Sequence, residues 1–273
     1  MRTVLAMILT LTCNSAPGLQ AQEVVPSDNS PLGLPASAAS SSADSAGVAR
    51  DVSWIKIIPN LASDQKRIWT SPVALARGKH WVPTLAVIGT TAALVLLVDS
   101  HEGAYFRKTA AFNGFSRVFS SNNTSLGIIV PPISLYVAGL VRKDSKMKST
   151  ALFAGEALAG AEIVTTIFKD IDRRLRPAGV PVNGNFSNTW FRDNTRPLRS
   201  NGSFPSGHAI GAFSVATVIA RRYGNHRWVP YVAYGGAALI GFSRMSLSSH
   251  FASDVFMGSA MGYAIARFAV LRQ

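Results

Sequence analysis

Six apolar segments limit what this chain can fold into more than any other feature. They span residues 81–98, 126–141, 150–168, 208–220, 229–243 and 251–271. All are rich in Ala, Gly, Val and Ile, and they are longer than ordinary strands, which favours helices. The sequence therefore predicts an all-α fold, a helical bundle of about six apolar helices.

The charges inside these segments bear on whether the bundle lies in a membrane. The first segment is uncharged and approaches the length of a membrane span. The third carries Glu156 and Glu162, and the sixth carries Asp254 and Arg267. Ionisable groups are tolerated in a membrane bundle where they face its interior or a polar site. We expect a membrane-embedded bundle, with a soluble bundle as the alternative.

Near the C-terminus, His250 and Asp254 stand four residues apart. This spacing predicts that both lie on one face of a helix, where the carboxylate can hold the imidazole in one tautomer and stabilise its cationic form. Such a pair suits a nucleophilic histidine. Arg244 lies six residues upstream and offers a planar, permanently charged donor fork to an anion held by His250. We expect that anion to be a phosphate.

A second motif lies at the end of the third apolar segment, where residues 169–177 read KDIDRRLRP. Lys169 and Arg176 are seven residues apart, which predicts two helical turns on one face, and Pro177 is expected to end the helix they share. Both charges would then point the same way. The loop that follows, residues 178–203, is expected to shape the substrate entrance.

The third motif, FPSGH at residues 204–208, leads into the fourth apolar segment. Pro205 and Ser206 occupy helix-start positions, and Gly207 lets the backbone approach a ligand closely. The first N–H groups of the helix and its dipole together predict an anion site. His208 stands at the edge of that site as a candidate proton donor.

Each motif alone has a plainer interpretation: a solvated helix end, a turn, or a surface pair of charges. Together they supply three cations, two histidines, a carboxylate and a helix N-terminus. This combination resembles the signature of the type 2 phosphatidic acid phosphatase and vanadium haloperoxidase superfamily, which reads KxxxxxxRP, PSGH and SRxxxxxHxxxD. The three parts stand at residues 169–177, 205–208 and 243–254, with no position missing, and the resemblance covers residues 80–272.

The resemblance implies a role for each residue of the motifs. His250 would attack phosphorus, Asp254 would orient it, and His208 would protonate the leaving group. The residues that would bind the phosphoryl oxygens are Lys169, Arg176, Ser206, Gly207 and Arg244.

Three cations around a phosphate can neutralise its oxygens and the extra charge of the transition state, which is the work of a magnesium ion in other phosphotransfer sites. The chain contains no HExxH, no CxxC and no aspartate-rich loop with metal-ligand spacing. We therefore expect a reaction with no metal and no cofactor.

The net charge of the chain indicates which classes of binding partner it suits. With 27 Lys and Arg against 14 Asp and Glu, the net charge is +13, which suits nucleic acid, anionic lipid or phosphorylated substrates. We expect no nucleic acid, because the basic residues do not alternate with aromatic ones and no DNA or RNA module is recognisable.

The expected function is a metal-independent phosphatase that hydrolyses phosphomonoesters or pyrophosphates through a phosphohistidine. The apolar scaffold favours lipid phosphates such as phosphatidate or an isoprenoid diphosphate as substrates. The alternatives are a soluble periplasmic acid phosphatase of broad specificity, a vanadate-dependent haloperoxidase, and a non-catalytic protein that kept the fold.

The N-terminal part divides into three. Residues 1–21 have the charged start, apolar stretch and small-residue exit of a cleaved signal peptide, and they contain the single cysteine, Cys13. Residues 22–50 are rich in Ser, Ala and Pro and predict a disordered linker. Residues 51–80 predict an amphipathic segment at the membrane interface, followed by the phosphatase bundle domain at 81–272.

Two short basic loops, at residues 142–148 and 221–227, predict the orientation. If both are cytoplasmic, the motifs face the periplasm from the inner membrane, and the chain before residue 81 must begin inside. A cleaved signal peptide would place it outside. Three solutions remain open: the signal is not cleaved, one segment does not span, or the bundle is soluble and periplasmic.

Overall fold

The computed structural model describes residues 50, 52–78, 81–193 and 201–272. The expected signal peptide at 1–21 and almost all of the expected linker at 22–50 lie outside the described residues. Every regular element in the described residues is helical and none is a strand, which confirms the all-α prediction.

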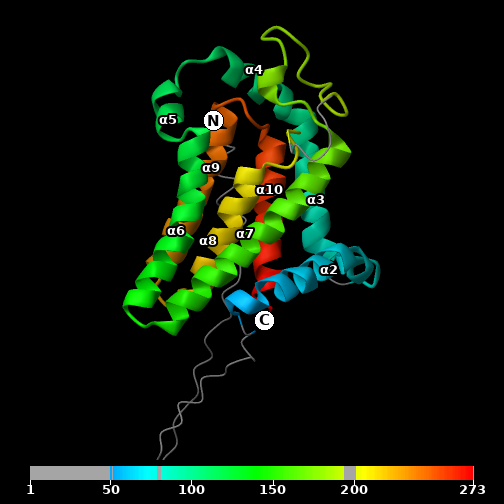
Figure 1. Ribbon diagram of the computed structural model, residues 1–273. Helices are drawn as coiled ribbons and strands as arrows, with labels where there is room; N and C mark the ends of the chain where they lie inside the picture. Colours follow the sequence, from blue (N-terminus) through cyan, green and yellow to red (C-terminus); the bar gives the residue numbers. More distant parts are fainter. Residues whose placement is uncertain (1–49, 51, 79–80, 194–200, 273) are drawn as a thin grey trace, which may run out of the picture. The chain divides into compact units, whose positions relative to one another are not determined.

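Figure 1 shows the arrangement of the helices. In chain order they are η1 (Trp54–Lys56), α2 (Ile57–Ala76), α3 (Trp81–Leu97), α4 (Asp99–Lys108), α5 (Asn113–Val118), α6 (Ser121–Val141), α7 (Ser145–Asp172), η2 (Pro177–Gly179), α8 (Gly207–Arg222), α9 (Trp228–Ser246), α10 (Ala252–Ala264) and the π-helical η3 (Ile265–Val270).

The six apolar segments correspond to α3, α6, α7, α8, α9, and α10 with η3. Two of these helices begin about five residues earlier than the apolar pattern because a polar residue caps a polar first turn. Ser120 caps α6 by accepting from the Asn123 N–H at 3.3 Å, and Asp144 caps α7 by accepting from the Met147 N–H at 3.0 Å. Helices α2, α4 and α5 lie outside the six segments.

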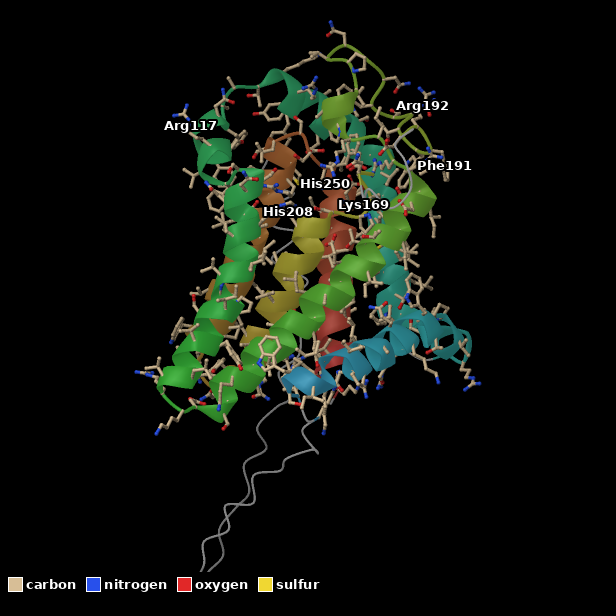
Figure 2. All side chains as sticks on the ribbon, in the orientation of Figure 1. Arg117, Lys169, Phe191, Arg192, His208 and His250 are labelled. Carbon is tan, nitrogen blue, oxygen red and sulfur yellow. The ribbon has the colours of Figure 1, made fainter. Side chains whose placement is uncertain are left out.

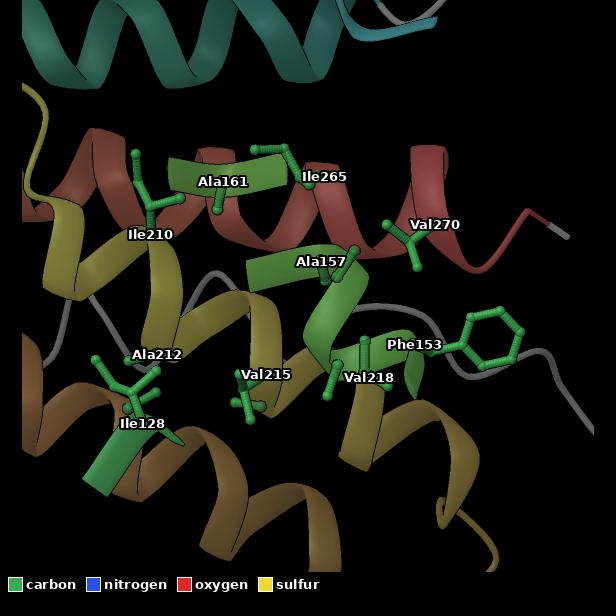
Figure 3. Packing of buried hydrophobic residues seen from close by; sticks show 14 of the residues in the cluster. Ile128, Phe153, Ala157, Ala161, Ile210, Ala212, Val215, Val218, Ile265 and Val270 are labelled. Carbon is green, nitrogen blue, oxygen red and sulfur yellow. The ribbon is translucent and has the colours of Figure 1, made fainter. Parts of the chain in front are cut away.

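Helix α8 is the centre of the bundle and packs against α7, α9 and α10. Its apolar residues interdigitate with those of the neighbouring helices in one core (Figure 3). The core includes Ile128, Phe153, Ala157, Ala161, Ile210, Val215, Val218, Ile265 and Val270.

The start of α8 lies unusually close to α10. A Cβ added at Gly258 of α10 would lie 2.7 Å from the backbone oxygen of Ser206 and 3.2 Å from the Cβ of Ala209. Only glycine fits at this contact, so the PSGH motif is held directly against the helix that carries Asp254.

Helices α6 and α7 are each long and apolar enough to cross a membrane. Helix α3 passes the same test only together with α4, to which it is joined by a bend of 55°. Large apolar side chains also face outward along three helices, which is unusual for a protein surrounded by water. They are Leu85, Ile88, Leu96 and Leu97 on α3, Leu126, Ile129, Val130, Ile133, Val137 and Leu140 on α6, and Trp228, Tyr231, Val232 and Leu239 on α9.

The segment expected at 51–80 forms η1 and α2. Ile55 and Ile58 are 90% and 78% exposed, whereas Asp64 on the inner face is buried against the bundle. The segment is therefore an amphipathic helix, and its location at a membrane interface stays a prediction.

Candidate active site

A cavity of about 340 Å³ lies where α7 ends and α8 begins. Figure 2 shows His208, His250 and Lys169 gathered at this end of the bundle, with Arg117, Phe191 and Arg192 farther out. The cavity is lined by Ser121, Ser125, Glu162, Thr165, Lys169, Arg176, Gly207, His208, Arg244, Ser249 and His250.

Six of the eight predicted site residues line this cavity. The other two, Ser206 and Asp254, are fully buried and contact each other through the Ser206 N–H and the Asp254 backbone oxygen at 3.0 Å. The structure thus brings three motifs that are separated by up to 85 residues in sequence, from Lys169 to Asp254, to one place.

The expectation that Lys169 and Arg176 share a helix is wrong. Helix α7 ends at Asp172, because its side chain accepts from the Arg174 N–H at 3.0 Å and Arg173 takes a left-handed conformation with φ of 44°. Arg176 is extended, as expected of a residue before proline. The chain turn still brings both cations to the cavity, where Arg176 Nε donates to the Asn201 backbone oxygen at 2.8 Å.

The PSGH motif forms the predicted helix start. Ser206 is the N-cap of α8 and its hydroxyl accepts from the Ala209 N–H at 3.4 Å. A Cβ on Gly207 would lie 3.2 Å from Thr165 Cγ2 and 3.8 Å from Lys169 Nζ, so glycine leaves the space beside the lysine open. The positive end of the α8 dipole therefore faces the cavity together with the cations.

Arg244 is held by the turn between α5 and α6. Its Nη2 donates to the Phe119 backbone oxygen at 2.8 Å, and its Nη1 donates to the Ser121 hydroxyl at 3.1 Å. Burial and, next, the charge of Arg176 lower the pKa of Arg244 to about 10. Arg244 is therefore still cationic at neutral pH, and two arginines face one cavity.

The expectation that His250 and Asp254 lie on one helix is also wrong. Helix α10 begins at Ala252, and the Asp254 carboxylate accepts from the Phe251 N–H at 2.8 Å and so closes the helix N-terminus after His250. The two side chains remain neighbours, with 3.7 Å between His250 Nδ1 and Asp254 Oδ2. The shorter contact of Nδ1 is with the Ser203 backbone oxygen, at 2.6 Å.

This contact fixes the tautomer of His250. A carbonyl oxygen can only accept, so Nδ1 carries the proton and Nε2 carries the lone pair. Burial lowers the pKa of His250 to about 3, despite the nearby Asp254 carboxylate, which raises it. The imidazole is therefore neutral at neutral pH, which is the form that can act as a nucleophile.

His208 faces the cavity from the first turn of α8. Its Nε2 lies 3.1 Å from the Ser125 hydroxyl and 3.4 Å from the Ser121 backbone oxygen. Burial, followed by the charge of Arg244, lowers the pKa of His208 to about 4. In the absence of an anion, His208 is therefore neutral near pH 7.

A buried network that was not predicted from the sequence lies behind His250. Arg174, 1% exposed, donates from Nη1 to Asp254 Oδ1 at 2.5 Å and from Nη2 to Asp99 Oδ2 at 2.7 Å. Ser203 donates from its hydroxyl to Asp254 Oδ2 at 2.5 Å. Burial alone would raise the pKa of Asp254, but Arg174 outweighs it and the pKa falls to about 2. A charged residue within the KDIDRRLRP stretch was the one available signal.

No described residue of the loop at 178–203 lines the cavity, and its role in shaping the substrate entrance stays a prediction. Trp190 lies inward, with its ring 4.4 Å from the Arg174 guanidinium, whereas Phe191 and Arg192 are exposed. Residues 194–200 of this loop lie outside the described residues.

Residues 150–273 match the family model of the PAP2 superfamily, and this segment contains all eight predicted site residues. A segment of 93 residues is 39% identical to the lipid A 1-phosphatase of Porphyromonas gingivalis, covering 34% of this chain and 17% of that protein. The match thus spans about a sixth of that relative's length.

The crystal structure of the first transmembrane PAP2 type phosphatidylglycerolphosphate phosphatase from Bacillus subtilis is also similar. It aligns over 77% of this chain and 92% of that one, with 19% identity and a TM-score of 0.37.

Proposed function

We propose that this chain, whose residues 150–273 match the family model of the PAP2 superfamily, is a phosphatase that hydrolyses lipid phosphates through a phosphohistidine at His250, without a metal ion. The observation that carries the proposal is one cavity lined by Lys169, Arg176, Arg244 and two histidines. This set can bind, attack and release a phosphate ester.

The three cations and the N-terminus of α8 hold the phosphate. Two planar guanidinium forks and an ammonium group can together contact its non-bridging oxygens and neutralise the charge that develops in the transition state. The N–H of Gly207 and the hydroxyl of Ser206 lie at the same helix start. Since these donors are fixed before the substrate arrives, little reorganisation opposes the reaction.

His250 then attacks phosphorus through Nε2. Its Nδ1 keeps its proton and continues to donate a hydrogen bond to the Ser203 backbone oxygen. The new N–P bond forms as the P–O bond to the leaving group breaks. The positive charge on the phosphorylated imidazole is stabilised by Asp254, 3.7 Å from Nδ1.

His208 protonates the leaving oxygen. Its low pKa in the empty cavity suits this task only after binding, because a phosphate dianion close to the imidazole raises that pKa toward neutrality. In the second half of the reaction, neutral His208 removes a proton from water, which attacks the phosphohistidine and releases inorganic phosphate.

A lipid substrate is supported by the outward-facing apolar side chains and by the helices that could cross a membrane. If the bundle spans a membrane, a cavity at its end would lie near the depth of lipid head groups. The name of the Porphyromonas gingivalis relative adds a lipid A 1-phosphate to the phosphatidate and isoprenoid diphosphate that the sequence suggests.

The orientation follows from the two basic turns. They join α6 to α7 and α8 to α9, at the opposite end of the bundle from the cavity, and Arg222 Nη2 contacts the Ser149 hydroxyl at 2.5 Å. If this basic end is cytoplasmic, the active site faces the periplasm. Arg50 donates to the Val270 backbone oxygen at 3.2 Å at that same end, so we propose for this orientation that the chain before residue 50 begins inside and that the signal peptide is not cleaved.

A phosphate-release assay tests the proposal. The full chain in detergent is given phosphatidate, an isoprenoid diphosphate, a lipid A 1-phosphate and p-nitrophenyl phosphate, and labelled phosphate is trapped on the protein. We expect a lipid phosphate to be the best substrate and the label to be on His250. Preference for p-nitrophenyl phosphate would favour the soluble acid phosphatase, and label on another residue would refute the mechanism.

Chelation of metal ions distinguishes a reaction supported by Lys169, Arg176 and Arg244 alone from one that needs a metal ion. Activity should survive EDTA and be inhibited by vanadate, which adopts the trigonal-bipyramidal geometry of the transition state. If EDTA abolishes activity and magnesium restores it, the three cations do not suffice. Bromide oxidation by the vanadate-loaded protein would indicate the haloperoxidase alternative.

A further inference from the structure

Arg174, Asp254 and Ser203 form a closed ring of hydrogen bonds. Arg174 Nη1 donates to Asp254 Oδ1 at 2.5 Å, the Ser203 hydroxyl donates to Asp254 Oδ2 at 2.5 Å, and the Ser203 N–H donates to the Arg174 backbone oxygen at 2.7 Å. All three residues are no more than 1% exposed. The ring therefore joins the loop after α7, the loop before α8 and the first turn of α10.

One member of this ring, Ser203, contacts the proposed nucleophile His250. The Ser203 backbone oxygen accepts from His250 Nδ1 at 2.6 Å, whereas the Asp254 carboxylate lies 3.7 Å from the same nitrogen. The group that sets the direction of the imidazole is thus the Ser203 carbonyl. Both carboxylate oxygens of Asp254 are occupied by Arg174, Ser203 and the Phe251 N–H.

Arg174 is itself fixed on every side. Its Nη2 donates to Asp99 Oδ2 at 2.7 Å and its Nε to the Thr189 hydroxyl at 3.2 Å. The rings of Trp190 and Phe251 lie 4.4 and 4.2 Å from the guanidinium carbon. A guanidinium with its donors and its faces in contact can hold a neighbour in one place.

We propose that Arg174 and Ser203 are positioning residues that orient His250 so that its Nε2 points at phosphorus. Both act through the Asp254 carboxylate, which accepts a hydrogen bond from each of them. This inference rests on the proposed function of His250 as the nucleophile. Neither residue lines the cavity, so each acts through His250 and not on the substrate.

Kinetics of Ser203→Ala and Arg174→Met test the proposal. Because the phosphate-binding cations are untouched, we expect kcat to fall about 10- to 100-fold while KM and vanadate affinity change less than about 2-fold. Arg50→Met is the matched control, since Arg50 is a partly buried arginine that contacts two buried carboxylates and does not line the cavity. It should lower the thermal midpoint and leave kcat unchanged at temperatures well below that midpoint.

A double variant sharpens the test. If Ser203 and Asp254 act as one unit, Ser203→Ala combined with Asp254→Asn should be no slower than the slower single variant, whereas independent effects would multiply. Unchanged kcat in Ser203→Ala, or equal kcat losses in Arg174→Met and Arg50→Met, would overturn the proposal.

The hydrogen bond of His250 Nδ1 to the Ser203 backbone oxygen gives a readout that needs no turnover. In nitrogen-15 spectra of histidine-labelled protein, with His250→Ala for assignment, we expect His250 protonated on Nδ1 in both the wild type and Ser203→Ala, because alanine keeps the backbone carbonyl. The Nδ1–H signal should be displaced or broadened in Ser203→Ala, because the carbonyl is no longer held through the Ser203 hydroxyl and Asp254. Identical spectra would refute the positioning role. If the wild type hydrolyses no phosphate ester, the proposed function fails, and the spectra still decide the positioning role.

Discussion

Arginines bind buried carboxylates at both ends of the bundle, but the two networks differ in what they hold. At the cavity end, Arg174 joins Asp99 to Asp254 and its side chain is 1% exposed. Asp254 lies 3.7 Å from Nδ1 of His250, so this network contacts the proposed nucleophile.

At the opposite end, Arg50 donates to both carboxylate oxygens of Asp64 at 2.9 Å and lies 3.2 Å from Glu156. Arg272 adds a contact to Asp64 at 2.8 Å. These residues tie α2 to α7 and to the end of η3, and none of them lines the cavity. The same side-chain chemistry therefore fastens helices at one end and positions a nucleophile at the other.

The largest contrast between the two ends should come from His250→Ala. Removing the nucleophile eliminates the covalent route, so phosphate release should fall by at least about 10⁴-fold with the helical circular dichroism unchanged. No single substitution in the Arg50 network should approach this loss. Substantial turnover by the variant would remove His250 from the nucleophile role.

His208→Ala should come next, and its effect should depend on the substrate. Hydrolysis of an alkyl phosphate such as phosphatidate should slow by about 10²- to 10⁴-fold, because the leaving alkoxide needs a proton. Hydrolysis of p-nitrophenyl phosphate should be much less affected, since its phenolate leaves unprotonated. Equal losses on both substrates would show that His208 binds phosphate and does not act as an acid.

A matched pair of carboxylate variants compares the networks directly. Asp254→Asn should lower kcat by about 10- to 100-fold. Asp64→Asn should leave kcat unchanged and destabilise the fold by about 3 kcal/mol, because it removes the charge of a buried carboxylate that two partly buried arginines contact. Steady-state kinetics and thermal unfolding of both variants provide the measurement, and a kcat loss in Asp64→Asn would contradict the division of roles.

The smallest effect concerns stability at acid pH. The folded-state pKa values of His250 and His208, about 3 and about 4, lie below the ordinary value of 6.5. Between pH 6.5 and these values, the two histidines are protonated in the unfolded chain but neutral in the folded protein. Their contribution to the free energy of unfolding is therefore fully present above pH 6.5 and is lost as the pH falls toward 4 and 3. His208→Ala should flatten part of the decline in thermal midpoint between pH 6.5 and 4, which thermal unfolding of both proteins across this pH range measures.

Local chemistry made most of the fold and the site residues predictable. The apolar segments marked six helices, and Ser206 before Gly207 marked the start of α8. The two geometric errors have one cause: spacing was taken as helical where a short-range hydrogen bond ends or begins a helix. Asp172 stops α7 before Arg176, and Asp254 starts α10 after His250.

The sequence alone determined which segments are helical, through the apolar segments. It also determined the residues of a phosphate site, because the residue types of the three motifs have few other uses together. Only the tertiary structure decided how the histidine is held. Asp99 precedes Arg174 by 75 positions and Ser203 by 104, and Arg174 and Ser203 are 29 positions apart, so no spacing rule links the three. Their contacts depend on a backbone carbonyl and on chain turns, and a backbone oxygen carries no signature in an amino-acid sequence.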